Sequence, residues 1–123
     1  MPLIPSALVI DDNADSMSAL SELLTALGSE RVRAVPSAEE ALEILKTESF
    51  SIILSDYRLE GMNGAEFLER LRQSGDQTPV VLLSGAPETR GVIRATGLER
   101  VDFFAKPFRL EELNGAMERL LAA

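Results

Sequence analysis

Side chains that could carry out chemistry together follow several short apolar runs of the sequence. These side chains belong to Asp11, Asp12, Asp56, Ser84 and Lys106. Carboxylates crowded into one place repel one another and raise each other's pKa unless a cation compensates their charge. Magnesium fits such a group because it prefers a few carboxylate oxygens, retained waters and phosphate oxygens, whereas calcium needs more oxygen ligands. A lysine and a hydroxyl facing the carboxylates would bind the remaining phosphoryl oxygens, so the set predicts phosphoryl transfer to a carboxylate.

The composition excludes several other kinds of site. The chain has 123 residues and neither cysteine nor histidine, which excludes disulfides, thiol catalysis, serine-histidine triads and histidine-ligated zinc. Its net charge of −8 argues against binding to nucleic-acid phosphates. No apolar run approaches the ~18 residues of a membrane span, and the first residues lack the features of a signal peptide. We therefore expect a cytoplasmic protein with neither a nucleic-acid nor a membrane partner.

Strands and helices are expected to alternate along the chain. Apolar runs predict strands at residues 7–10, 32–35, 52–54, 80–83 and 101–104. Three of these runs are continuously apolar, which suits strands buried on both faces, whereas the more polar second run is expected at a sheet edge. Helical spacing of apolar residues covers 17–27, 38–45, 67–71, 88–96 and 110–120, most weakly in 88–96, where Gly91 interrupts it. Ser37 and Glu40 predict a capping box for the second helix.

This alternation predicts an α/β fold in one domain, with a five-stranded parallel sheet and helices on both of its faces. We assign residues 1–123 to this domain, with its core over about 6–121. Ligands of open α/β sheets bind beyond the carboxyl ends of the strands. Each candidate residue alone has a structural explanation, such as a helix cap, a turn or a solvated lysine. Their joint occurrence after four strands favours a shared site.

The ordered motifs resemble the receiver domain of two-component response regulators, over about residues 6–121. The motifs, with the order and spacing of that family, are Asp11-Asp12, the strand 52–56, the turn Gly61-Met62-Asn63-Gly64, Ser84-Gly85-Ala86, and Phe103-Phe104-Ala105-Lys106-Pro107-Phe108. The resemblance implies a flavodoxin-like (βα)5 fold and a signalling switch rather than a turnover enzyme.

The resemblance also implies a role for each matching residue. Asp56 would accept a phosphoryl group from the phosphohistidine of a histidine kinase or a histidine phosphotransfer protein. Asp11, Asp12, Asp56 and the backbone carbonyl of Arg58 would hold Mg²⁺. Lys106 would pair with the phosphoryl oxygens, and its bond to Pro107 resembles the cis peptide of the family.

Ser84 and Phe103 match the switch positions of the family. Ser84 would bond to the phosphoryl group, and the Phe103 ring would turn into the space behind it. Such a movement would reshape the surface of the fourth helix, fifth strand and fifth helix. This surface is expected to contact a downstream protein target, an output domain or a second copy of the chain, with Arg90, Arg94, Asp102 and Arg109 as candidate contacts.

Some positions depart from the family pattern and leave alternatives open. Arg58 and Ala86 stand where the family controls access of the hydrolytic water, so Arg58 could either shield or bind the acyl phosphate, and Glu60 replaces a frequent proline. A docking module of the same fold without phosphorylation remains an alternative. A magnesium phosphatase of the haloacid-dehalogenase kind would need an aspartate where Arg58 stands, and a flavodoxin-type flavin site would need a loop less acidic than residues 11–15.

Overall fold

The computed structural model describes residues 6–106 and 109–122, which form alternating strands and helices. The elements in chain order are β1 (Ser6–Ile10), α1 (Ala14–Ala26), β2 (Arg31–Val35), α2 (Ala38–Leu45), β3 (Ile52–Asp56), α3 (Gly64–Gln73), β4 (Val80–Ser84), α4 (Thr89–Ala95), β5 (Val101–Ala105) and α5 (Leu110–Ala122). The predicted strands and helices are all present. The first and third helices begin three residues earlier than the apolar spacing indicated, because polar capping residues precede the first apolar positions.

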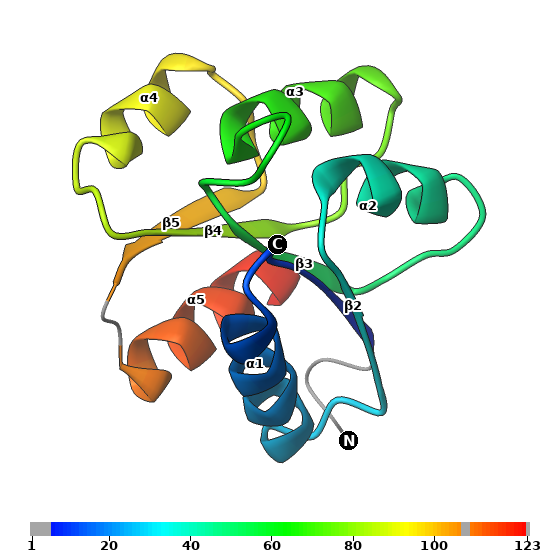
Figure 1. The fold of residues 1–123 in the computed structure, drawn as a ribbon. Helices are drawn as coiled ribbons and strands as arrows, with labels where there is room; N and C mark the ends of the chain where they lie inside the picture. The colour runs from blue at the N-terminus through cyan, green and yellow to red at the C-terminus, as the bar shows by residue number, and fades with distance from the viewer. Residues whose placement is uncertain (1–5, 107–108, 123) are drawn as a thin grey trace.

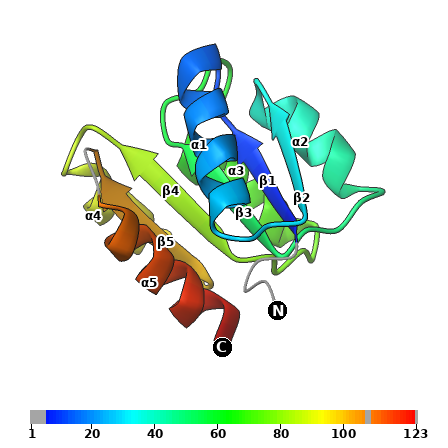
Figure 2. The same cartoon turned by 90° about the horizontal axis from the view of Figure 1, so that it is seen from below.

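One parallel sheet forms the centre of the molecule. The strand order is β2-β1-β3-β4-β5, which places the polar second strand at an edge, as predicted. Helices α2, α3 and α4 cover one face, and α1 and α5 cover the other (Figure 1). In Figure 2 the strand arrows point the same way, so that the loops after the strands gather at one edge. The chain reverses its direction of sheet growth between β1 and β3, and such a position opens a crevice for ligands.

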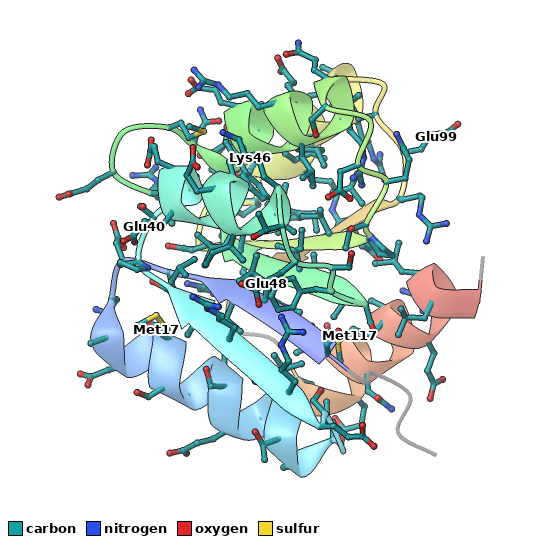
Figure 3. All side chains as sticks on the ribbon, turned by 90° about the vertical axis from the view of Figure 1, so that its right-hand side faces the viewer. Met17, Glu40, Lys46, Glu48, Glu99 and Met117 are labelled. Atoms are coloured by element: carbon teal, nitrogen blue, oxygen red, sulfur yellow. The ribbon has the colours of Figure 1, made fainter. Side chains whose placement is uncertain are left out.

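The sheet separates two apolar cores. Along β1, Leu8 and Ile10 pack towards α2 and α3, whereas Ala7 and Val9 pack towards α1 and α5. All four of these side chains are fully buried, which explains why central strands read as continuous apolar runs. Figure 3 shows the same division, with Met17 and Met117 on the side of α1 and α5 and Lys46 on the opposite side.

Polar residues fix the helix starts next to the strand ends. Asn13 caps α1 by accepting a hydrogen bond from the backbone N–H of Ser16 at 2.9 Å. Ser37 caps α2 by accepting from the Glu40 N–H at 3.2 Å, but the Glu40 carboxylate accepts from the Ser37 hydroxyl rather than from the Ser37 N–H that a capping box requires. The complete capping box is instead that of Asn63 and Glu66 at the start of α3. No helix within the described ranges is long and apolar enough to span a membrane.

Candidate functional site

Three aspartates meet where β1 and β3 end side by side. Ile10 of β1 pairs with Ser55 of β3, so that the residues following these two positions come together. Oxygen atoms of Asp11, Asp12 and Asp56 all lie within 4.8 Å of one another. Asp11 is buried and Asp12 is exposed, so the group has one member in the interior and one that is open to solvent. The structure therefore brings together the three carboxylates that the sequence assigned to a metal.

Only one of the two carboxylate oxygens of Asp11 has a hydrogen-bond partner among the described residues. Its Oδ1 accepts a hydrogen bond from the Asn13 N–H at 2.9 Å, whereas its buried Oδ2 has no partner among the described residues. Burial raises the pKa of Asp11, and the negative charges of Asp56 and Asp12 raise it further against the opposing effects of the Asn13 N–H and Lys106. A divalent cation bound here would supply the missing partner. The side chains of this group offer only carboxylate oxygens as ligands, and such a set fits magnesium.

Lys106 reaches the same site from β5. Its backbone N–H donates to the Ser84 carbonyl at 2.7 Å, which extends the pairing of β4 and β5 by one residue. Its Nζ donates to Oδ1 of Asp56 at 3.0 Å. The Asp56 side chain is 16% exposed and the Lys106 side chain 35% exposed, so the ion pair lies at the border between interior and solvent. The predicted cis bond to Pro107 lies outside the described residues.

Ser84 ends β4 with a buried hydroxyl that is occupied within its own loop. Its Oγ lies 3.1 Å from Oγ1 of Thr89 and accepts a hydrogen bond from the Ala86 N–H at 3.0 Å. The Ser84 hydroxyl makes no hydrogen bond to Asp56 or to Lys106, all three of which are described. The contact of Thr89 could not be predicted from the sequence, because a threonine near the start of a helix is too common to indicate it.

The loop after β3 is folded back onto the strand ends. Tyr57 donates its N–H to the Leu83 carbonyl at 2.8 Å, and its own carbonyl accepts from the Gly64 N–H at 2.7 Å. A Cβ at Gly64 would lie 2.9 Å from a methyl carbon of Leu82, so only glycine fits there without displacement. The Arg58 side chain is exposed beside this loop. The role of its carbonyl as a metal ligand stays a prediction.

Phe103 is a core residue in this structure. It is 3% exposed and belongs to the apolar cluster on the side of α4. Arg90 donates from Nη2 to the Phe103 carbonyl at 2.9 Å and lies over its ring. The other candidate contacts on this side differ in exposure, since Arg94 and Arg109 are exposed, whereas Asp102 is partly buried and lies 3.4 Å from Arg119.

Comparison with known proteins decides the family. The family model described as the response regulator receiver domain matches residues 7–118. This chain is a member of the response regulator receiver domain family. Members of this family are phosphorylatable switches of two-component signal transduction and are not generally classed as enzymes. The match favours this function over the phosphatase and flavin-binding alternatives.

Individual relatives of this receiver domain include both longer and equally short proteins. The response regulator protein TodT of Pseudomonas putida is 32% identical over 113 residues, which cover 92% of this chain and 49% of TodT. A probable chemotaxis protein CheY of Rhizobium etli is 27% identical over 94% of this chain and 92% of its own length. The structure of the chemotaxis response regulator CheY4 of Vibrio cholerae matches with a TM-score of 0.82 and 27% identity, over 96% of this chain and 97% of CheY4. The chain thus spans about half of some relatives and nearly all of others.

Proposed function

We propose that this receiver domain accepts a phosphoryl group on Asp56 from the phosphohistidine of a histidine kinase or a histidine phosphotransfer protein. The observation that carries the proposal is the position of Asp56, which lies within reach of two further carboxylates on one side and of Lys106 on the other. No other described carboxylate combines a lysine contact with membership of an acidic cluster in this way. Asp56 is also only partly buried, so that a partner's phosphoryl group could approach it.

The transfer step follows from the contacts of Asp56. Lys106 occupies Oδ1 of Asp56, which leaves Oδ2 as the oxygen free to attack phosphorus. A bond forms between this oxygen and phosphorus while the phosphorus–nitrogen bond of the phosphohistidine breaks, and its electron pair stays on the imidazole nitrogen. Lys106 then offsets part of the negative charge that the phosphoryl group adds. Ser84 lies at the neighbouring strand end, where its hydroxyl could donate to a phosphoryl oxygen once it leaves Thr89.

Magnesium is the cofactor that the acidic group supports. Asp11, Asp12 and Asp56, together with the carbonyl of Arg58, would hold it, and it would neutralise negative charge between the carboxylates and the phosphoryl oxygens. The buried Oδ2 of Asp11, which lacks a partner among the described residues, is the observation that supports this assignment.

Phosphorylation would act on other proteins through the surface of α4, β5 and α5. The exposed residues Arg90, Arg94 and Arg109 give this surface cationic groups despite the negative charge of the whole chain. A downstream target, an output domain or a second copy of the chain would bind there. The cytoplasmic location and the extent of the domain over 1–123 remain predictions.

The test is phosphorylation by a small donor. Incubation of the purified chain with acetyl phosphate and magnesium should add one phosphoryl group that is labile to base and to hydroxylamine, as an acyl phosphate is. Asp56→Asn should abolish the labelling, and Asp15→Asn, which alters an exposed carboxylate in the first turn of α1, should leave it intact. Absence of labelling in the wild-type chain would favour a docking module that works without phosphorylation, and a stable phosphate on Ser84 would refute the mechanism.

A further inference from the structure

Two adjacent residues at the start of α4 contact the two residues that match the switch positions. Oγ1 of Thr89 lies 3.1 Å from the hydroxyl oxygen of Ser84. Nη2 of Arg90 donates to the carbonyl oxygen of Phe103 at 2.9 Å, and its guanidinium carbon lies 5.0 Å from the centre of the Phe103 ring. A single turn of α4 is therefore attached to β4 through one residue and to β5 through the next.

The contact between Thr89 and Ser84 is buried and specific. Ser84 is 2% exposed and Thr89 is 4% exposed. A hydroxyl has one proton to donate and two lone pairs, and the Ser84 oxygen already accepts from the Ala86 N–H. Where the Ser84 hydroxyl donates its single proton to Thr89, it must give up this contact before it can donate to a phosphoryl group on Asp56. The Thr89 hydroxyl is thus a competitor for the bond that phosphorylation requires.

Arg90 contacts Phe103 in a different manner, from the solvent side. Its guanidinium lies over the ring, where a cation is attracted by the negative face of the aromatic system, and it also binds the backbone of the same residue. A pocket of about 220 Å³ opens beside the ring, with Ile93 and Arg94 in its lining. The ring thus borders open space rather than solid packing on this side, and Arg90 is the charged contact that holds it.

The first turn of α4 is held weakly by its own backbone. The N–H groups of Thr89, Arg90 and Gly91 bond three residues back, at 3.1, 3.2 and 3.2 Å, instead of four. Bonds of this kind have poorer geometry than those of an α-helix. Glu88 precedes the helix without a side-chain cap bond to any described residue. The contacts of Thr89 with Ser84 and of Arg90 with Phe103 therefore help to position this turn.

We propose that Thr89 and Arg90 are positioning residues of the switch, and that their adjacency couples Ser84 to Phe103. Thr89 retains the Ser84 hydroxyl in the unphosphorylated domain, and Arg90 holds the Phe103 ring buried. When Ser84 moves to a phosphoryl group, the turn that carries Thr89 loses one attachment and shifts, and Arg90 shifts with it. The movement of Ser84 in this proposal rests on the proposed phosphorylation of Asp56, whereas the contact between Arg90 and Phe103 does not.

The role of Arg90 can be measured without phosphorylation. In magnesium-free protein, the methyl NMR signals of Ile93 report on the Phe103 ring, because both side chains line the same pocket. Arg90→Met, which keeps the apolar stem of the side chain, should lower the population of the ring conformation that contacts Arg90, relative to other ring conformations, by roughly fivefold, the factor that a cation–π contact supplies. Arg90→Lys keeps the cation and should restore part of the change. Arg94→Met is the matched control, since Arg94 lines the same pocket and, within the described residues, makes no hydrogen bond to Phe103. Equal effects of the two methionine variants, or none, would overturn the role of Arg90.

The role of Thr89 is measured with beryllofluoride, a phosphoryl mimic, in the presence of magnesium. Thr89→Val keeps the shape of the side chain but removes the competing hydroxyl, and should lower the beryllofluoride concentration for half-saturation by roughly fivefold, the factor that one hydrogen bond supplies. Thr89→Ser should restore the wild-type value. Unchanged or weaker binding in Thr89→Val, with wild-type resistance to unfolding, would overturn the role of Thr89.

Coupling between the two contacts is tested with the double variant Thr89→Val, Arg90→Met. If one turn carries both contacts, the effects of the two substitutions on beryllofluoride binding should not add, because adjacent residues that share a moving element interact. Additive effects would contradict the coupling. If the wild-type chain binds no beryllofluoride, the phosphorylation of Asp56 and the role of Thr89 both fail, while the Ile93 signals still decide whether Arg90 holds the ring.

Discussion

The Nζ of Lys106 lies 3.0 Å from Oδ1 of Asp56, which joins the end of β5 to the end of β3 across 50 positions of sequence. The strand order places β4 between the two, so the lysine side chain crosses a neighbouring strand end to reach the aspartate. In the absence of a phosphoryl group, Lys106 and a metal ion therefore compete for the same carboxylate.

Removal of this competition should strengthen magnesium binding. Lys106→Met takes one positive charge from the edge of the site and should tighten Mg²⁺ binding about fivefold, since two unit charges about 4 Å apart in water interact by about 1 kcal/mol. A magnesium titration followed by NMR measures this change. Lys46→Met, which breaks an exposed ion pair with Glu43 on α2, is the control and should leave the affinity unchanged. Weaker magnesium binding in Lys106→Met would refute the competition.

Asp12 should matter for the metal and little for folding. Asp12 is exposed, and substitutions at such positions usually change stability by no more than about 0.5 kcal/mol. Asp12→Ala should nevertheless weaken Mg²⁺ binding by at least about tenfold, a loss seen even for residues that only support metal ligands. The measurements are a magnesium titration and a urea unfolding curve, with Asp15→Ala as the exposed control in the same loop-helix segment. Equal magnesium affinity in both variants would remove Asp12 from the ligand set.

In the magnesium-free domain, the charged carboxylate of Asp11 should lower the free energy of unfolding at neutral pH. Its folded-state pKa is raised above the ordinary value of 3.8, chiefly by burial, so the native state disfavours the charged form. The unfavourable contribution is absent below the unfolded pKa, grows as the pH rises towards the folded pKa, and is complete above it. Asp11→Asn should therefore raise the free energy of unfolding at pH 7 by about 1 kcal/mol, within the range of single stabilising substitutions.

Urea unfolding at several pH values without magnesium measures this prediction. The difference between Asp11→Asn and the wild-type chain should shrink as the pH falls through the folded pKa and vanish below 3.8, where the wild-type carboxyl is also neutral in both states. A variant that is less stable than the wild type at pH 7 would show that the hydrogen bond of Asp11 to Asn13 outweighs the burial of its charge.

Gly64 should not tolerate a side chain. A Cβ at this position would lie 2.9 Å from Leu82 and 3.2 Å from the backbone Cα of Tyr57. Gly64→Ala should lower the free energy of unfolding by about 1–3 kcal/mol, as overpacking of a close contact does. Gly115→Ala in α5 is the control, because its Cβ would meet only the end of the Arg119 side chain at 3.6 Å. Thermal unfolding of both variants provides the comparison, and similar stability of the two would show that the loop after β3 adjusts freely.

Gly91 should accept alanine with a gain in stability. Gly91 lies within α4, and a Cβ there would meet no described atom within 4 Å. Gly91→Ala should raise the free energy of unfolding by about 0.5–1 kcal/mol, because glycine has a larger entropic penalty in a helix than alanine has. Gly97→Ala should have the opposite effect, since Gly97 has a φ of +69°. Amide hydrogen exchange in α4 provides the measurement. Exchange rates in Gly91→Ala that are no slower than in the wild-type chain would contradict the expected gain in stability of this helix.

The sequence alone determined the fold class and the members of the acidic site. Continuous apolar runs such as 80–83 identify strands buried on both faces, and the carboxyl ends of parallel strands meet at one edge. Asp11 and Ser84 follow such runs directly, and Asp56 and Lys106 stand two positions after the predicted strands 52–54 and 101–104, so their convergence could be predicted without coordinates. Capping was less predictable, because the same kinds of residue form one half of a box at Ser37 and a complete box at Asn63.

Only the tertiary structure decided which partner each group has. Three features depend on side-chain orientations between separate elements: the Oδ2 of Asp11 without a partner among the described residues, the bond of Ser84 to Thr89, and the position of Arg90 over Phe103. The sequence carries no local signal for them, since threonine and arginine at the start of a helix are common and serve many contacts. Strand pattern and spacing therefore determine where functional groups gather, whereas the packing of α4 on β4 and β5 determines how they are held.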